Sequence, residues 1–102
     1  MEKFFVEFNE YEPKYIQISN NIKKLINEKR ISGGEKLPTI RALAKFLAVN
    51  NDTIVSCYKR LVSDGYAVQK VVSGAYVKKR DMISFFKREY SREIKSMISS
   101  KD

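Results

Sequence analysis

Apolar residues recur with a helical period over residues 14–30, directly after Pro13, which suits the first turn of a helix. The spacing places one apolar residue per turn on a single face, made of Tyr15, Ile18, Ile22, Leu25 and Ile26. This pattern predicts a first helix over about 14–30. Residues 31–34, Ile-Ser-Gly-Gly, are expected to end it, because glycine readily takes the left-handed conformation that follows helices.

Two shorter segments with the same period follow. Thr39 is a good N-cap for a second helix over about 40–47, since its hydroxyl can accept from a free amide of the first turn. The expected apolar face comprises Ile40, Leu43, Ala44 and Leu47. After a tight connection over 48–50, Asn50 or Asn51 is expected to cap a third helix that Asp64-Gly65 closes. Its predicted buried face comprises Ile54, Tyr58, Leu61 and Val62, with Cys57 on the packing side.

The rest of the chain carries three further signals. Runs rich in β-branched and aromatic residues over 66–72 and 75–78, around Ser73-Gly74, predict a hairpin. Residues 4–8 have similar character and predict a short strand or an extended arm. A C-terminal helix is expected over about 81–99, with an apolar face that must pack on the first helix or on a second copy of the chain; this face comprises Ile83, Phe86, Tyr90, Ile94, Met97 and Ile98.

The order of elements predicts an α+β fold, mainly α, in which three helices and a β-hairpin wing form a winged helix-turn-helix with a C-terminal helix. Small and apolar residues at fixed spacing support close crossing of the second and third helices: Ala44, Ala48, Val49, Ile54 and Cys57. We therefore expect an N-terminal arm or short strand over 1–12, the winged domain over 13–79, and a helix for dimerisation or linkage over 80–102.

The charge of the chain gives information about its binding partner. The 102 residues carry a net charge of +8, which favours a polyanionic partner. The excess lies in the middle of the chain: residues 1–12 sum to −3, residues 13–40 to +4, residues 41–80 to +6 and residues 81–102 to +1. A folded surface, and not a charged tail, is therefore expected to present it.

Composition also excludes several classes of function. The chain has one cysteine and no histidine, so it can form neither an intrachain disulfide nor a multi-cysteine zinc site. No paired-carboxylate or phosphate-loop motif is present, so we expect neither an enzyme nor a cofactor. No apolar run is long enough to cross a membrane, and the N-terminus has no signal-peptide pattern. A cytoplasmic protein is expected.

Separated motifs resemble, in order, the winged DNA-binding domain of GntR-family bacterial transcription regulators. They span about residues 13–78 and comprise 13–18 (PKYIQI), 34–44 (GEKLPTIRALA), 47–49 (LAV), 53–55 (TIV), Tyr58, Leu61, Gly65-Tyr66 and 73–77 (SGAYV). The motif at 13–18 and the Gly-Tyr pair look closest to the YtrA and MocR subgroups. YtrA members end in a short helical dimerisation tail, and MocR members continue into an aminotransferase-like domain; residues 81–99 fit the tail or the linker.

The resemblance implies a DNA interface on the second and third helices. Arg41 lies where the family contacts DNA and can bind a phosphate or a guanine edge. Lys36 belongs to the same motif, and Thr39 caps a helix end that can receive a phosphate. Four residues open the third helix and can reach base edges: Asn50, Asn51, Asp52 and Thr53. Since the family often has arginine where Asn51 stands, Asn51 is expected to select adenine or to cap the helix.

The wing supplies the remaining candidates. Ser73 and Gly74 are expected at phosphates or in the minor groove, and Lys70 adds positive charge. Together these features predict a transcription regulator that binds a palindromic double-stranded DNA operator as a homodimer. The alternatives are a winged module for protein or RNA contacts without an operator, and a membrane-surface protein that docks through residues 83–98. The sequence does not identify the operator, a small-molecule effector or the direction of regulation.

Overall fold

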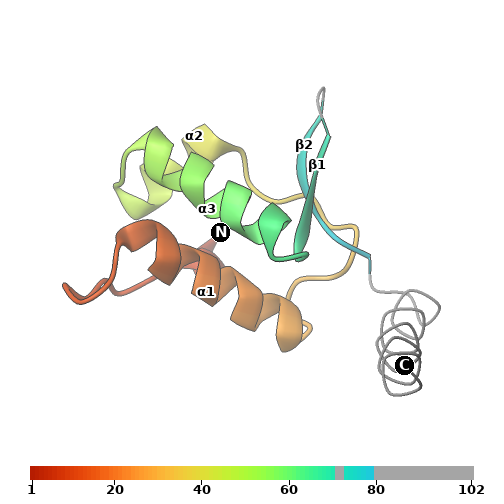
Figure 1. Cartoon of the computed structure of the whole chain (residues 1–102), viewed down its shortest axis with the longest axis horizontal. Coiled ribbons are helices and arrows are strands. Elements are labelled where there is room, and N and C mark those ends of the chain that lie inside the picture. The colour runs from red at the N-terminus through yellow and green to blue at the C-terminus, as the bar shows by residue number, and fades with distance from the viewer. Residues whose placement is uncertain (71–72, 80–102) are drawn as a thin grey trace, which may run out of the picture.

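A short 3-10 helix (η1), three α-helices and a two-stranded antiparallel hairpin make up the computed structural model, which describes residues 1–70 and 73–79 (Figure 1). The elements are η1 (Glu2–Phe4), α1 (Lys14–Asn27), α2 (Ile40–Leu47), α3 (Asn51–Ser63), β1 (Ala67–Lys70) and β2 (Gly74–Val77). This arrangement confirms the predicted winged-helix class. The expected helix over 81–99 lies outside the described residues.

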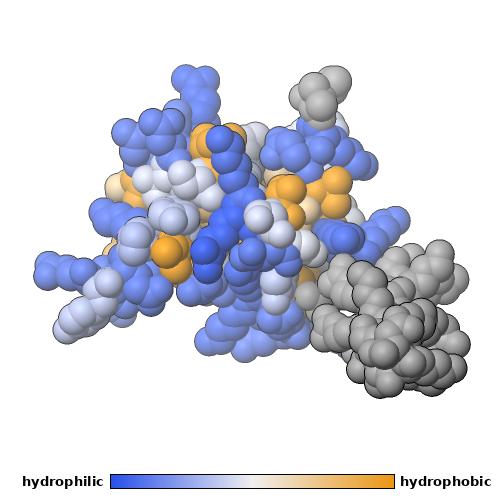
Figure 2. Space-filling view, in the orientation of Figure 1, coloured by the Kyte–Doolittle hydropathy of each residue, from blue (hydrophilic) through white to orange (hydrophobic). Residues whose placement is uncertain are grey.

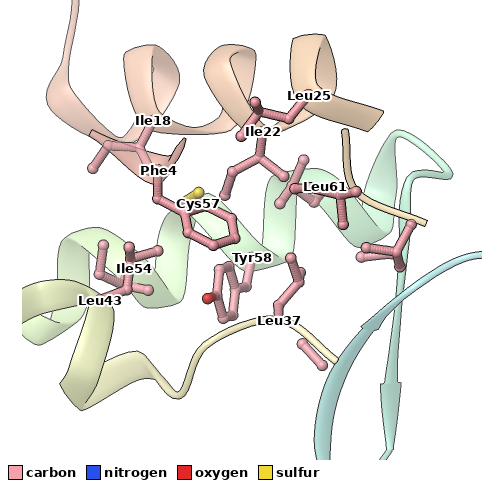
Figure 3. Close-up of a cluster of buried hydrophobic side chains, with 14 of the residues drawn as sticks. Phe4, Ile18, Ile22, Leu25, Leu37, Leu43, Ile54, Cys57, Tyr58 and Leu61 are labelled. Carbon is pink, nitrogen blue, oxygen red and sulfur yellow. The ribbon is translucent and has the colours of Figure 1, made fainter. Parts of the chain in front are cut away.

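A single apolar core lies between α1, α2, α3 and the base of the hairpin (Figure 3). It comprises Phe4, Ile18, Ile22, Leu25, Ile31, Leu37, Leu43, Ala44, Leu47, Ile54, Cys57, Tyr58, Leu61, Ala67, Ala75 and Val77. The prediction that Val62 is buried is wrong: it is 38% exposed, whereas Leu61 is 0% exposed. Cys57, which was expected on the packing side, completes the buried stripe instead, because this stripe follows positions 54, 57, 58 and 61.

The end of α1 differs from the prediction. The helix ends at Asn27, and the left-handed residue that follows it is Lys29, with a φ of 59°, not either glycine of the expected breaker. Backbone hydrogen bonds from the amides of Arg30 (2.8 Å) and Ile31 (3.3 Å) to the carbonyl of Leu25 close the turn. The turn directs Ile31 into the core, where its burial offsets the backbone strain at Lys29.

We expect Lys29→Gly to raise the free energy of unfolding by about 0.5–1 kcal/mol, because glycine removes the left-handed penalty at the cost of some unfolded-state entropy. Chemical denaturation of the purified protein measures this. Glu28→Gly is the matched control, since Glu28 has an ordinary φ of −83° and should lose stability on the same change. Equal loss in both variants would contradict the assignment of strain to Lys29.

The N-terminal segment forms no strand. The strand alternative for residues 4–8 is wrong, because η1 occupies Glu2–Phe4 and directs Phe4 into the core at 4% exposure. The side chain of Gln17 fixes the following segment to α1. Its Oε1 accepts from the amide of Asn9 (3.0 Å), and its Nε2 donates to the carbonyls of Asn9 (3.1 Å) and Glu12 (2.7 Å). Side-chain hydrogen bonds from Gln17 thus fix residues 9–12, which follow the aromatic segment, against the start of α1.

The hairpin is joined to the helices through the loop before α2. Within the hairpin, Ala67 pairs with Val77 and Lys70 with Gly74. On the other edge of β2, the amide of Leu37 donates to the carbonyl of Ala75 (2.9 Å), and Lys36 forms an isolated bridge with Tyr76. The loop thereby adds a short third strand-like segment to the wing. None of the helices in residues 1–70 and 73–79 has the length and apolar character that crossing a membrane requires.

Candidate nucleic-acid interface

The turn between α2 and α3 has a fixed, left-handed geometry. Ala48 has a φ of 55°, and its amide donates to the carbonyl of Lys45 (3.3 Å) while the amide of Val49 donates to that of Ala44 (2.9 Å). Val49 packs against the core. Because this turn satisfies the last carbonyls of α2 within three residues, α3 can begin at once and cross α2 closely, as a helix-turn-helix requires.

Both helices begin at side-chain caps. Thr39 Oγ1 accepts from the amide of Ala42 (3.1 Å), which confirms the predicted cap of α2. Asn50 Oδ1 accepts from the amide of Asp52 (2.9 Å), so Asn50 and not Asn51 caps α3. Capping fixes the starts of two helices whose positive dipole ends suit anionic groups.

The cap divides the roles of the two asparagines. Reading adenine with both hydrogen bonds requires a free amide oxygen and a free amide nitrogen. The oxygen of Asn50 is already used by the helix, whereas Asn51 is exposed and makes no side-chain hydrogen bond within the described residues. Asn51 is therefore the better placed of the two for a bidentate contact.

The neighbouring residues present different chemistry. Asp52 is exposed in the first turn of α3, where its negative charge is favourable to the helix dipole. Thr53 is half-buried, and its amide donates to the carbonyl of Asn50 (3.0 Å). Arg41 is exposed in the first turn of α2 and forms no ion pair within the described part of the chain. Its guanidinium is thus available to a partner.

Four candidate residues line one hollow between the start of α2 and the wing, which we call the α2–wing hollow. It has a volume of about 150 Å³, and its lining includes Lys36, Thr39, Ser73 and Gly74. The lysine chain lies close to the wing, because a Cβ built on Gly74 would meet Lys36 Cε at 3.4 Å. Glycine at a φ of 111° therefore serves both the turn and this close approach.

Lys70 lies at the side of this site. Its Nζ lies 4.6 Å from the centroid of the Tyr76 ring, a distance at which the ring attracts the cation. Tyr76 is also the residue that pairs with Lys36 across the edge of β2. Lys36 and Lys70 thus lie close to the same tyrosine, and both contribute positive charge near the α2–wing hollow.

The helix starts and the wing lie on one side of the molecule. Figure 1 shows α2, the first turns of α3 and the adjoining ends of β1 and β2 along the upper side, with α1 on the opposite side of α3. Hydrophilic side chains project from this upper edge in Figure 2. The starts of α2 and α3 and the hairpin therefore share one side of the molecule, which we call the upper surface.

Two contributors to the site were not predicted. Gln69 lines the α2–wing hollow from β1; its position in the same strand as Lys70 was the only sequence signal. Tyr58 was predicted as a packing residue of α3, but it also takes part in the site, because its hydroxyl donates to the carbonyl of Pro38 (2.7 Å). Burial raises the pKa of Tyr58, so the phenol keeps the proton it donates. This bond joins α3 to the loop that carries Lys36 and Thr39.

Cys57 is a core residue, as the sequence predicted. It is 0% exposed, and burial raises its pKa from 9.0 to about 12, with the charge of Lys23 acting in the opposite direction. Since the unfolded thiol loses its proton first, the stability that Cys57 contributes is complete below pH 9 and is lost as the pH rises toward 12.

We expect Cys57 in the native protein to resist a chromogenic disulfide reagent at pH 8, because the buried thiol is not ionised at this pH and the reagent cannot reach it. The same reagent should titrate one thiol per chain after unfolding in guanidinium. Absorbance at the reagent's wavelength measures both reactions. Native reaction at the rate of a free cysteine would contradict the assigned burial.

Comparison with known proteins assigns a family to this geometry. The model of bacterial regulatory proteins of the gntR family matches residues 14–77. The HTH-type transcriptional regulator YdeL of Bacillus subtilis (strain 168) is 35% identical over 69 residues, which cover 68% of this chain and 15% of YdeL. A second relative is a putative L-lactate dehydrogenase operon regulatory protein of Escherichia coli (strain K12), of which the chain covers 25%. The chain thus spans a small part of both relatives.

Solved structures share the fold over more of their length. YtrA from Sulfolobus acidocaldarius, a GntR-family transcription factor, superposes with a TM-score of 0.71 at 29% identity, covering 90% of this chain and 97% of that one. The DNA-binding domain of AraR in complex with operator ORX1 superposes with a TM-score of 0.64 at 27% identity, covering 72% and 93% of the two chains.

Proposed function

The chain belongs to the gntR family of bacterial regulatory proteins and carries the family's winged-helix DNA-binding domain, and on this basis we propose that it is a sequence-specific regulator that binds a palindromic operator as a homodimer. The observation that carries the proposal is the upper surface, on which two capped helix starts and a basic wing lie together. The operator complex of AraR, which has the same fold, supports DNA as the partner.

In this proposal the candidate residues divide into two groups. Asn51, with Asp52 and Thr53 beside it, provides contacts to base edges in the major groove, and Asn50 holds the start of α3 in position. Arg41, Lys36 and Lys70 provide affinity through phosphates or a guanine edge, assisted by Thr39, Ser73 and Gly74 at the α2–wing hollow. Sequence preference then resides mainly in α3, and salt dependence in α2 and the wing.

A homodimer accounts for specificity that one small module does not provide. Two copies related by a twofold axis double the contact area and place two α3 helices about one turn of DNA apart. We propose that this homodimer acts in the cytoplasm.

Selection from a pool of random DNA duplexes tests the proposal. We expect an enriched site with twofold symmetry and half-sites separated by about one helical turn. Titrations at several salt concentrations should then give a slope of log affinity against log salt of about −5, if six phosphates are neutralised per dimer. Weak binding without sequence enrichment would contradict the proposal and favour the winged module for protein or RNA contacts.

A further inference from the structure

A second hollow lies at the root of the wing, on a different part of the surface from the α2–wing hollow. We call it the wing-root hollow; it has a volume of about 330 Å³, and its apolar lining comes from Ile26, Ile31 and Val77. Exposed Lys29 and half-buried Lys78 belong to the same lining. The hollow therefore combines an apolar floor with a positively charged rim.

The described chain ends beside this hollow. Val77 and Lys78 line it, and Lys79 follows immediately. Two hydrogen bonds to the 34–35 loop hold the end of β2 in place: the amide of Gly34 donates to the carbonyl of Val77 (2.8 Å), and the amide of Val77 donates to the carbonyl of Glu35 (2.9 Å). A Cβ on Gly34 would lie 2.8 Å from Lys79 Cε, so the lysine chain packs directly on this glycine. The following residues must start at the edge of the hollow.

The residues that follow Lys79 in the sequence have side chains that suit the hollow, and they are close enough along the chain to reach it. Residues 81–86, Asp-Met-Ile-Ser-Phe-Phe, place one acidic residue before four apolar ones. Asp81 complements the lysine rim, and Ile83 is four residues from Lys79, a span of about 6 Å in a helix and up to about 14 Å in an extended chain. Either conformation brings an apolar side chain within reach of a hollow that begins at Lys78.

We propose that the wing-root hollow is the docking site of residues 81–86 of the same chain, with Ile83 against the apolar floor and Asp81 at the lysine rim. This goes beyond DNA binding, because it connects the residues after the domain to the strand that forms the wing. The loop that pairs with Val77 continues into Lys36 and Thr39, so the docked segment supports the same loop that carries part of the proposed interface.

Disulfide trapping in the full 102-residue protein tests the proposal without DNA, so its outcome is independent of operator binding. Ser32 lines the hollow and is exposed, and Ser84 lies inside the proposed segment. We expect the double variant Ser32→Cys, Ser84→Cys to form an intrachain disulfide under mild oxidation. Cys57 should not interfere, because it is buried and its pKa is raised to about 12.

The matched control is Ser56→Cys with Ser84→Cys, since Ser56 is also exposed but lies on α3 and does not line the hollow. We expect the first pair to react at least tenfold faster, and Ile83→Asp in the first pair to remove the difference. Mass spectrometry of mixed isotope-labelled and unlabelled protein distinguishes links within a chain from links between chains. Equal rates in the two pairs, an unaffected Ile83→Asp variant, or links mainly between chains would each overturn the proposal.

Discussion

Replacing Arg41 with alanine should weaken operator binding by about 1–3 kcal/mol, which raises the dissociation constant roughly 5- to 150-fold. The side chain is exposed in the first turn of α2 and has no ion pair within the described residues, so its loss leaves no buried group unsatisfied. The effect should therefore come from the partner and not from folding. Fluorescence anisotropy with a selected duplex measures the affinity, and circular dichroism confirms an unchanged fold.

The salt dependence of Arg41→Ala separates its two possible contacts. Loss of a phosphate contact should reduce the salt slope by about 0.9 for each arginine and weaken all sequences alike. Loss of a guanine contact should instead relax the preference at one base pair. Arg30→Ala is the control, because Arg30 is also exposed but follows α1, the helix that lies on the other side of α3. Equal losses in both variants would show that only net charge matters, and unchanged binding in Arg41→Ala would remove the residue from the interface.

Local signals predicted the helices that surround the site. The sequence-based bounds of α2 agree with the structure because a cap at Thr39 and a short apolar stripe are both properties of adjacent residues. The start of α3 was left between Asn50 and Asn51, since either amide can cap a helix. Only the geometry of the turn at Ala48 decides that Asn50 Oδ1 meets the amide of Asp52.

Tertiary contacts decided what the sequence left open or misassigned. The end of α1 depends on burying Ile31, which forces Lys29 and not a glycine into the left-handed conformation. The segment before α1 is fixed by Gln17, a contact that no strand pattern predicts. Both features depend on partners distant in sequence, which periodicity does not detect.

The same limit applies to the candidate site. Sequence patterns placed Lys36 before α2 and Gly74 in the wing, but nothing in them indicated that the two residues line one hollow. That proximity results from the pairing of the 34–37 loop with β2, including the hydrogen bond from Leu37 to Ala75. The contribution of Gln69 follows from the same pairing, since β1 lies next to β2.

Leu61→Ala should have the largest effect on folding, lowering the free energy of unfolding by about 2–5 kcal/mol. Leu61 is 0% exposed on α3 and faces α1 beside Ile22 and Leu25 (Figure 3). Truncation removes apolar burial and leaves a cavity between the two helices that hold the domain together. Since small domains unfold at a total cost of about 5–15 kcal/mol, the variant should unfold at a clearly lower denaturant concentration.

Val62→Ala provides a control at the adjacent position. Both residues are aliphatic and lie on the same helix, but Val62 is 38% exposed, so its truncation should change the stability by no more than about 0.5 kcal/mol. The comparison tests the corrected buried face of α3 directly, because the original stripe required both side chains in the core. Equal destabilisation by the two variants in urea titrations would support the buried face predicted from the sequence and contradict the orientation of α3 in the structure. A larger loss of stability in Leu61→Ala than in Val62→Ala would also indicate which side of α3 is free to bind DNA, since α1 covers the face that carries Leu61.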